Sequence, residues 1–267
     1  MANLYSAVSI KQFFHEIYAI LRGTDNKATE VWFEFSEISF FNNINKFELL
    51  EFISNFEFME IKKGNYNVKF VSINKVLFVM EAIRIMRLDI KDIVSELLDY
   101  NGFEVLVNQI LSKNNYKVLN NFRFSDKSNF KSKTSQKRYE IDVIGIKRKE
   151  ILLIDAKQWR RKDSFGSMNK AANLQFQRAI ALKYNPDAFS KLIHNILGIN
   201  PDVSNRLPFK LLPIMVSLED NFNKLNDNQV PLVSIYYLNS FLQELERYLQ
   251  YYKMIKIKSV NIQKKLI

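Results

Sequence analysis

Cysteine is absent from the 267-residue chain, and histidine occurs only as His15 and His194. Disulfides, thiol nucleophiles and thiolate metal sites are therefore excluded, and a histidine-rich zinc site is not expected. No apolar run reaches the about 18 residues that a membrane-spanning helix needs, and the N-terminus lacks the charged start and cleavage site of a secretory signal. We expect a cytoplasmic protein without a membrane partner, in which any metal ion has oxygen ligands.

Positive charge is concentrated in the second part of the chain. Residues 1–100 hold 11 Lys and Arg against 14 Asp and Glu, whereas residues 101–267 hold 28 against 14, so the net charges are −3 and +14. A basic surface of this kind suits nucleic acid, because binding to phosphates releases counterions. The alternative is that the lysines only keep the protein in solution. The acidic first part is a candidate surface for a protein partner.

Residues 1–92 are predicted to form a small helical domain that contains a β-hairpin. Apolar side chains recur three and four residues apart over 9–22 and 46–55, as in amphipathic helices. Alternation around Gly64 indicates the hairpin, and a helix over about 74–88 follows. The order is compatible with a winged-helix-like module, although the negative charge is unusual for a DNA reader. Packing, dimerisation and partner binding are the alternatives.

Residues 93–267 are predicted to form a three-layer α/β domain, because helical and strand patterns alternate along them. Helices are expected within 90–115, with a break at Gly102, over 168–184, and near the C-terminus with an N-cap at Asn239 or Ser240. Strands are expected in the segments YKVLNNFRF, YEIDVIGI, EILLIDAK, FKLLPIMVSL and VPLVSIYYL.

Charged residues end one of the most apolar runs of the chain, since ILLI is followed by Asp155 and Lys157. Burial of an ion costs several kcal/mol unless it is compensated. Pairing Ile146 with Ile151 across a hairpin loop places Asp142 opposite Asp155, and side-chain alternation then puts Lys157 on the same face. Opposed carboxylates about 5 Å apart repel each other. We therefore expect that neutralising Asp155 does not destabilise the protein when metal is absent.

A divalent cation would remove this repulsion. Mg²⁺ is commonly held by one or two carboxylates together with water and substrate phosphate, and Mn²⁺ is a possible substitute. Lys157 would lie near the bound water or the phosphate. This layout is typical of metal-assisted phosphodiester hydrolysis. The alternative is that Asp155 and Lys157 form only a strand-end ion pair worth about 1 kcal/mol or less.

These residues resemble the PD-(D/E)xK nuclease superfamily. Asp142 lies thirteen residues before Asp155-Ala156-Lys157, which is similar to the signature of that superfamily, and the closest likeness is to Mrr-like restriction endonucleases and archaeal Holliday-junction resolvases. Ile141 stands where the name-giving proline would be, and Asp155 replaces the commoner glutamate. The resemblance implies a restriction-endonuclease-like mixed sheet flanked by helices, and a Mg²⁺-dependent DNA endonuclease that is restriction-like or specific for branched DNA and junctions.

Further parts of the chain extend the resemblance. The segment NGFEVLVNQILSKNNYKVLNN is similar to the group's first helix and strand, where Glu104 occupies the place of a glutamate that joins the active site. Trp159 matches an aromatic residue often found after the lysine. Gln177 lies where relatives place a glutamine that faces DNA, and Gln175 is its competitor. The resemblance implies catalytic residues Glu104, Asp142, Asp155, Lys157 and Gln177, with Glu104, Asp142 and Asp155 as metal ligands.

Basic residues after the motif are candidates for phosphate contacts. An alternative is a nucleic-acid-binding module with weak or lost catalysis that acts as a subunit of a larger DNA-processing complex. A homodimer is a further expectation, because cutting both strands with one active site per chain favours two copies. The candidate contacts are Arg160, Arg161, Lys162, Lys170, Arg178 and the loop 127–138.

Overall fold

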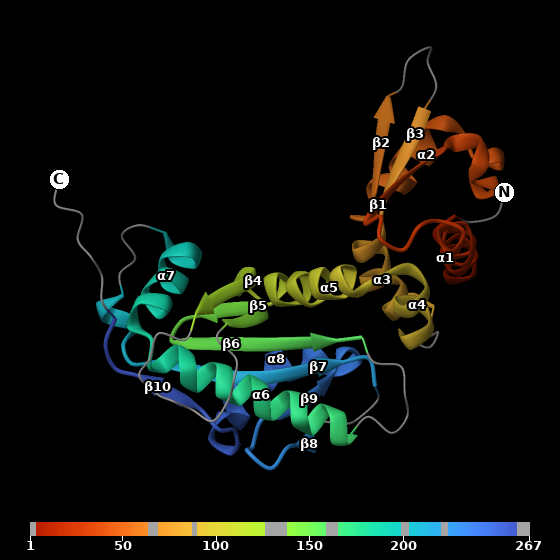
Figure 1. Ribbon diagram of the computed structural model, residues 1–267. Helices are drawn as coiled ribbons and strands as arrows, with labels where there is room; N and C mark the ends of the chain where they lie inside the picture. The colour runs from red at the N-terminus through yellow and green to blue at the C-terminus, as the bar shows by residue number, and fades with distance from the viewer. Residues whose placement is uncertain are drawn as a thin grey trace, which may run out of the picture. The chain divides into compact units, whose positions relative to one another are not determined.

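The computed structural model describes residues 4–63, 69–86, 90–125, 138–158, 165–198, 203–219 and 224–260 (Figure 1). It divides the chain into two compact units, Met1–Leu106 and Val107–Ile267. The division falls within helix α5 (Tyr100–Lys113), whereas the sequence suggested a boundary after residue 92. Within the described part, no helix combines the length and the apolar character needed to cross a membrane.

The N-terminal unit contains a three-stranded antiparallel sheet with the order β1-β3-β2. The predicted hairpin is confirmed as β2 and β3, and the predicted helices are confirmed as α1, α2 and α3; the turn residue Gly64 lies outside the described residues. The winged-helix-like assignment stays a prediction. The elements of this unit before α5 are α1 (Ala7–Arg22), β1 (Glu30–Glu34), two 3-10 helices (Phe35–Glu37 and Ser39–Asn43), α2 (Lys46–Ser54), β2 (Met59–Lys63), β3 (Lys69–Asn74), α3 (Lys75–Ile85) and α4 (Ile90–Leu97).

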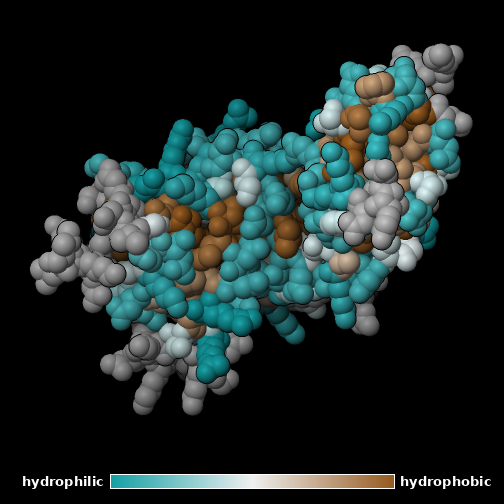
Figure 2. All heavy atoms as spheres, turned by 90° about the horizontal axis from the view of Figure 1, so that it is seen from above, coloured by the Kyte–Doolittle hydropathy of each residue, from teal (hydrophilic) through white to brown (hydrophobic). Residues whose placement is uncertain are grey.

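Phenylalanine rings fill the core of the N-terminal unit. The Phe13 ring lies 5.1 Å from that of Phe52 and 5.2 Å from that of Phe56, and Phe14 stacks on Phe78 at 5.5 Å. Such ring pairs add stability beyond their buried area. Apolar side chains also reach the visible surface of this unit (Figure 2), and Phe47 is 81% exposed.

The C-terminal unit is built on a mixed sheet with the order β4-β5-β6-β7-β9-β8, and β10 pairs with β7. Strand β5 pairs antiparallel with both β4 and β6, whereas the β6–β7 and β7–β9 pairs are parallel. The elements are β4 (Lys117–Ser125), β5 (Arg138–Lys147), β6 (Glu150–Lys157), α6 (Phe165–Lys183), α7 (Pro186–Leu197), β7 (Phe209–Ser217), β8 (Lys224–Leu225), β9 (Pro231–Ser234), α8 (Ile235–Tyr248), β10 (Ile255–Ile257) and 3-10 helices at Ser204–Arg206 and Leu249–Tyr251.

Helices flank this sheet, and Figure 1 shows α6 in front of the strands and α8 behind them. Ile151 and Leu153 of β6 share a buried cluster with Ala179 and Leu182 of α6. Residues two apart on a strand point to the same face, so the face of β6 that packs on α6 continues to position 155. The mixed α/β fold with a helix-flanked sheet is therefore confirmed.

Two predicted helix boundaries are wrong. Helix α8 begins at Ile235 instead of near Asn239, because the Ser234 hydroxyl caps it by accepting from the Tyr236 N–H at 3.4 Å. The break between α4 and α5 consists of Leu98 and Asp99, and the Asp99 carboxylate accepts from the Gly102 N–H at 2.8 Å. Gly102 thus belongs to the first turn of α5.

Candidate functional site

The β5–β6 hairpin has the register that the sequence predicts. Ile146 pairs with Ile151, and regular pairing continues to Val143 and Ile154. The turn is tight, with Arg148 in the left-handed region at φ 54°. Asp142 lies one residue beyond the last regular pair, and its side-chain Oδ2 accepts a hydrogen bond from the Ala156 N–H at 2.9 Å.

Lys157 joins the two acidic residues of the hairpin. Its Nζ lies 3.4 Å from Asp142 Oδ2 and 3.2 Å from Asp155 Oδ1. The Asp142 and Asp155 residues are 6% and 1% exposed, whereas the lysine side chain is 24% exposed. The structure therefore brings the three strand residues together at one end of the hairpin, and the lysine side chain is the most exposed of the three. Their catalytic roles stay a prediction.

The pKa of the Asp142 carboxyl is shifted by its surroundings. Burial raises the pKa of the Asp142 carboxyl above its ordinary value, and the neighbouring Asp155 carboxylate raises it as well. The Lys157 ammonium and the Ala156 N–H act in the opposite direction. Removal from water disfavours the charged form of an acid, and a like charge nearby does the same. An added cation would oppose both effects, because a nearby positive charge favours the charged form of an acid.

Helix α6 supplies two more residues to this cluster. Arg178 Nη1 donates to Asp155 Oδ1 at 2.8 Å and to Gln175 Oε1 at 2.9 Å. Gln175 is fully buried, whereas Gln177 is exposed on the other side of the helix. Of the two candidate glutamines, the structure brings Gln175 to the acids. The side chain of Arg178, a predicted phosphate contact, is 13% exposed and pairs with Asp155, and its role toward phosphate stays a prediction.

Asparagine side chains fix α6 over the sheet. Asn173 Oδ1 accepts from the side-chain amides of Asn226 and Asn228, each at 2.7 Å.

The contact between Gln175 and Arg178 was not predicted from the sequence, although their spacing of three residues puts both side chains on one face of the helix. Only the rotation of α6 about its axis decides that this face meets Asp155.

The other predicted site residues are placed as follows. Glu104 lies on α5 within the N-terminal unit and is 5% exposed; its share in the site stays a prediction. Lys170 is exposed on α6, the helix that carries Arg178. Arg138 is the one residue of the loop 127–138 that the structure describes, and it begins β5. Trp159, Arg160, Arg161 and Lys162 lie outside the described residues.

The two carboxylates suit a hard cation by their chemistry. Mg²⁺ and Mn²⁺ prefer oxygen ligands, and Mg²⁺ is often held by only one or two carboxylates while water and phosphate complete its shell. In the part of the chain that the structure describes, no group of three or more His, Cys, Asp or Glu is placed to hold a metal ion. The contacts of Asp155 with described residues all use Oδ1. Asp142 and Asp155 therefore fit a cation that takes its remaining ligands from water and substrate.

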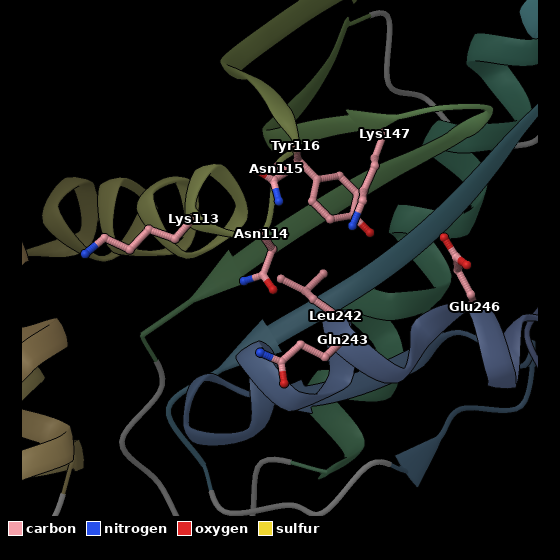
Figure 3. Close-up of a pocket in the computed structure, with 8 residues that line it drawn as sticks. All are labelled: Lys113, Asn114, Asn115, Tyr116, Lys147, Leu242, Gln243 and Glu246. Atoms are coloured by element: carbon pink, nitrogen blue, oxygen red, sulfur yellow. The ribbon is translucent and has the colours of Figure 1, made fainter.

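A separate polar cavity of about 390 Å³ lies at the other end of the hairpin (Figure 3). Lys147 of the turn lines it, with its Nζ 5.3 Å from the centre of the Tyr116 ring. Because Asp142 is five residues from Lys147, a strand rise of about 3.3 Å per residue puts the two positions roughly 16 Å apart. The cavity does not include the acidic cluster. Its lining consists of Lys113, Asn114, Asn115, Tyr116, Lys147, Leu242, Gln243 and Glu246.

Residues 101–197 match the family model NERD, described as a nuclease-related domain. This stretch contains Asp142, Asp155, Lys157 and all of α6. The match supports the nuclease part of the resemblance, and it does not distinguish a Mrr-like or resolvase-like group. The matched segment suggests a nucleic-acid substrate.

No curated protein matches the chain. A solved structure described as protein VC1899 from Vibrio cholerae is 12% identical, with a TM-score of 0.31, and the alignment covers 92% of this chain and 53% of that one. The chain thus spans about half the length of that protein. At this level of similarity the likeness carries no argument about function.

Proposed function

We propose that the protein is a divalent-metal-dependent endonuclease that hydrolyses DNA phosphodiester bonds at the cluster of Asp142, Asp155 and Lys157. The observation that carries this proposal is the bridging position of Lys157, whose Nζ lies within 3.4 Å of one carboxylate and 3.2 Å of the other. The match of residues 101–197 to a nuclease-related domain supports it independently.

Each residue of the cluster has a defined task in this proposal. Asp142 and Asp155 would hold Mg²⁺ or Mn²⁺. The bound cation supplies Lewis acidity and a bound water of lowered pKa. Lys157 is the most exposed member of the cluster, so its ammonium group is available to hold a phosphate oxygen and to stabilise the negative charge that develops there.

The substrate contacts extend from the cluster along α6. Lys170 is exposed on that helix, and Arg160, Arg161 and Lys162 follow β6 closely in the sequence. Lys and Arg contacts to phosphates position a duplex without reading its sequence. The proposal therefore includes both a restriction-like enzyme and one specific for branched DNA or junctions, and cutting of both strands favours a homodimer.

A second candidate is a nucleic-acid-binding module with weak or lost catalysis, acting as a subunit that a partner recruits through the acidic N-terminal unit. The observation that favours it is the Arg178–Asp155 contact at 2.8 Å, because a positive side chain already neutralises one of the two proposed metal ligands. It predicts retained DNA binding without cleavage.

The deciding experiment incubates the purified full chain with labelled linear, nicked, flapped and four-way DNA in Mg²⁺, Mn²⁺ or EDTA. The nuclease proposal requires cleavage of at least one substrate with metal and none in EDTA. Binding to these DNAs without cleavage in either metal would support the second candidate instead. Cleavage that persists in EDTA would contradict both.

A further inference from the structure

Arg178 contacts Asp155 through one nitrogen only. Its Nη1 donates to both Asp155 Oδ1 and Gln175 Oε1, whereas a strong arginine–carboxylate pair is bidentate, with two parallel N–H···O bonds. Arg178 Nε and Gln175 Nε2 are both buried and make no hydrogen bond to any residue that the structure describes. Buried donors without acceptors cost free energy. The contact between Arg178 and Asp155 is therefore one that a better partner can replace.

Among the residues that the structure describes, the charges in contact at this cluster are balanced. Two carboxylates, Asp142 and Asp155, face two cationic groups, Lys157 and Arg178. A divalent cation added to this arrangement would leave two excess positive charges beside acids that are 6% and 1% exposed. Like charges at short distance in a poorly solvated site repel strongly. Metal binding therefore requires one of the two positive side chains to leave.

Arg178 is the side chain that can leave. Lys157 contacts both carboxylates, whereas Arg178 contacts only Asp155. Arg178 also comes from the helix, so its departure leaves the hairpin and the backbone hydrogen bond to Asp142 intact.

We propose that Arg178 is a built-in competitor of the divalent cation, which occupies Asp155 until metal and a nucleic-acid phosphate arrive together. This inference rests on the proposed function and describes the regulation of the same site. A phosphate adds negative charge, which offsets the excess positive charge, and its oxygens are acceptors for the released guanidinium. Metal and nucleic acid should therefore bind with positive coupling.

The test measures Mn²⁺ binding to the full chain by calorimetry, first without nucleic acid and then with a DNA oligonucleotide. In Arg178→Gln the dissociation constant for Mn²⁺ without DNA should fall roughly tenfold or more, the factor that corresponds to about 1.4 kcal/mol. Adding DNA should lower the constant in the parent protein, and by a smaller factor in Arg178→Gln. The matched control is Lys183→Gln, which removes an exposed positive charge from the same helix and should change the constant by less than about twofold, because exposed charges are screened.

A second variant keeps the positive charge of Arg178 and removes one of its two hydrogen-bond acceptors. Gln175→Leu removes the side-chain oxygen that accepts from Arg178 Nη1, and should also strengthen Mn²⁺ binding, by a smaller factor than Arg178→Gln. Circular dichroism and the Mn²⁺-dependent rise in Tm check that each variant folds and binds.

The outcomes separate the inference from the function. If Arg178→Gln and Gln175→Leu both bind Mn²⁺ no more tightly than a parent protein that cleaves DNA, the competitor role is wrong and the nuclease function stands. If the parent neither binds Mn²⁺ in the presence of DNA nor cleaves, both are overturned. Tighter binding in Arg178→Gln that Lys183→Gln does not share supports the competitor role.

Discussion

Replacing Asp155 with asparagine in the metal-free protein should destabilise it, contrary to the expectation from carboxylate repulsion alone. The change leaves Arg178, 13% exposed, and Lys157, 24% exposed, without their shared acidic partner. Breaking a buried ion pair by removing one partner costs about 3–5 kcal/mol. The asparagine oxygen can still accept a hydrogen bond from Arg178, which offsets about 1 kcal/mol of this loss in the free energy of unfolding. The repulsion between the Asp142 and Asp155 carboxylates is also relieved. We therefore expect a net loss of about 2 kcal/mol in the free energy of unfolding.

Urea unfolding in EDTA at neutral pH, followed by circular dichroism, measures this loss. Glu244→Gln is the matched control, because it neutralises an exposed acid of α8 in the same unit and should change the unfolding free energy by less than about 0.5 kcal/mol. An Asp155→Asn protein as stable as its parent would show that Arg178 and Lys157 do not depend on this carboxylate, and would refute the charge balance described for the cluster.

Two further predictions concern the same unit. Because the pKa of Asp142 is raised in the native state, the native protein keeps a proton that the unfolded chain releases at a lower pH, so its stability without metal should fall as pH rises from the ordinary to the raised pKa. Urea unfolding measured against pH should show a smaller fall in Asp142→Asn than in the parent. An identical pH dependence in the two proteins would contradict the raised pKa. Gly145→Val should lower the free energy of unfolding by about 1–3 kcal/mol, because a Cβ at Gly145 would lie 3.2 Å from Tyr116 Cδ1. Gly166→Ala is the control in urea unfolding, since a Cβ at Gly166 would meet open space. Equal stability of the two variants would refute the tight packing around Gly145.

The hairpin register could be predicted because it depends on local sequence. Two apolar runs flank a short charged loop, so pairing Ile146 with Ile151 buries both runs together, and a slip by one residue would expose them. Lys157 follows from the same alternation. These residues needed no information from the rest of the chain.

The role of Arg178 could not be predicted in this way. The residue lies on a helix whose apolar residues do not define a narrow stripe, and its rotation over β6 is fixed by distant contacts such as those of Asn173 with Asn226 and Asn228. A basic residue on such a helix looks like a phosphate contact until the packing is known. The sequence alone therefore predicts the two aspartates of the cluster, but not that Arg178 forms an ion pair with Asp155.

Misplaced or missed elements have a related cause. The start of α8 was placed too late because Ser234 is followed by Ile235 and two tyrosines, residue types that favour strands, while the cap at Ser234 depends on the end of β9. Strand β1 was not predicted, since in EVWFE only Phe33 is buried and its pairing with β3 involves residues about 40 positions away.

Single-turnover cleavage of labelled DNA in Mg²⁺ by the parent, Asp142→Asn and Glu140→Gln tests the central claim most directly. Glu140 lies two residues before Asp142 on the same strand, but its carboxylate pairs with Arg123 at 2.8 Å on the surface. The account predicts that Asp142→Asn loses at least about a hundredfold in rate, since the residue holds the catalytic cation, while it still binds DNA and Glu140→Gln cleaves like the parent. Undiminished metal-dependent cleavage by Asp142→Asn would contradict the account and place any nuclease activity elsewhere in the protein.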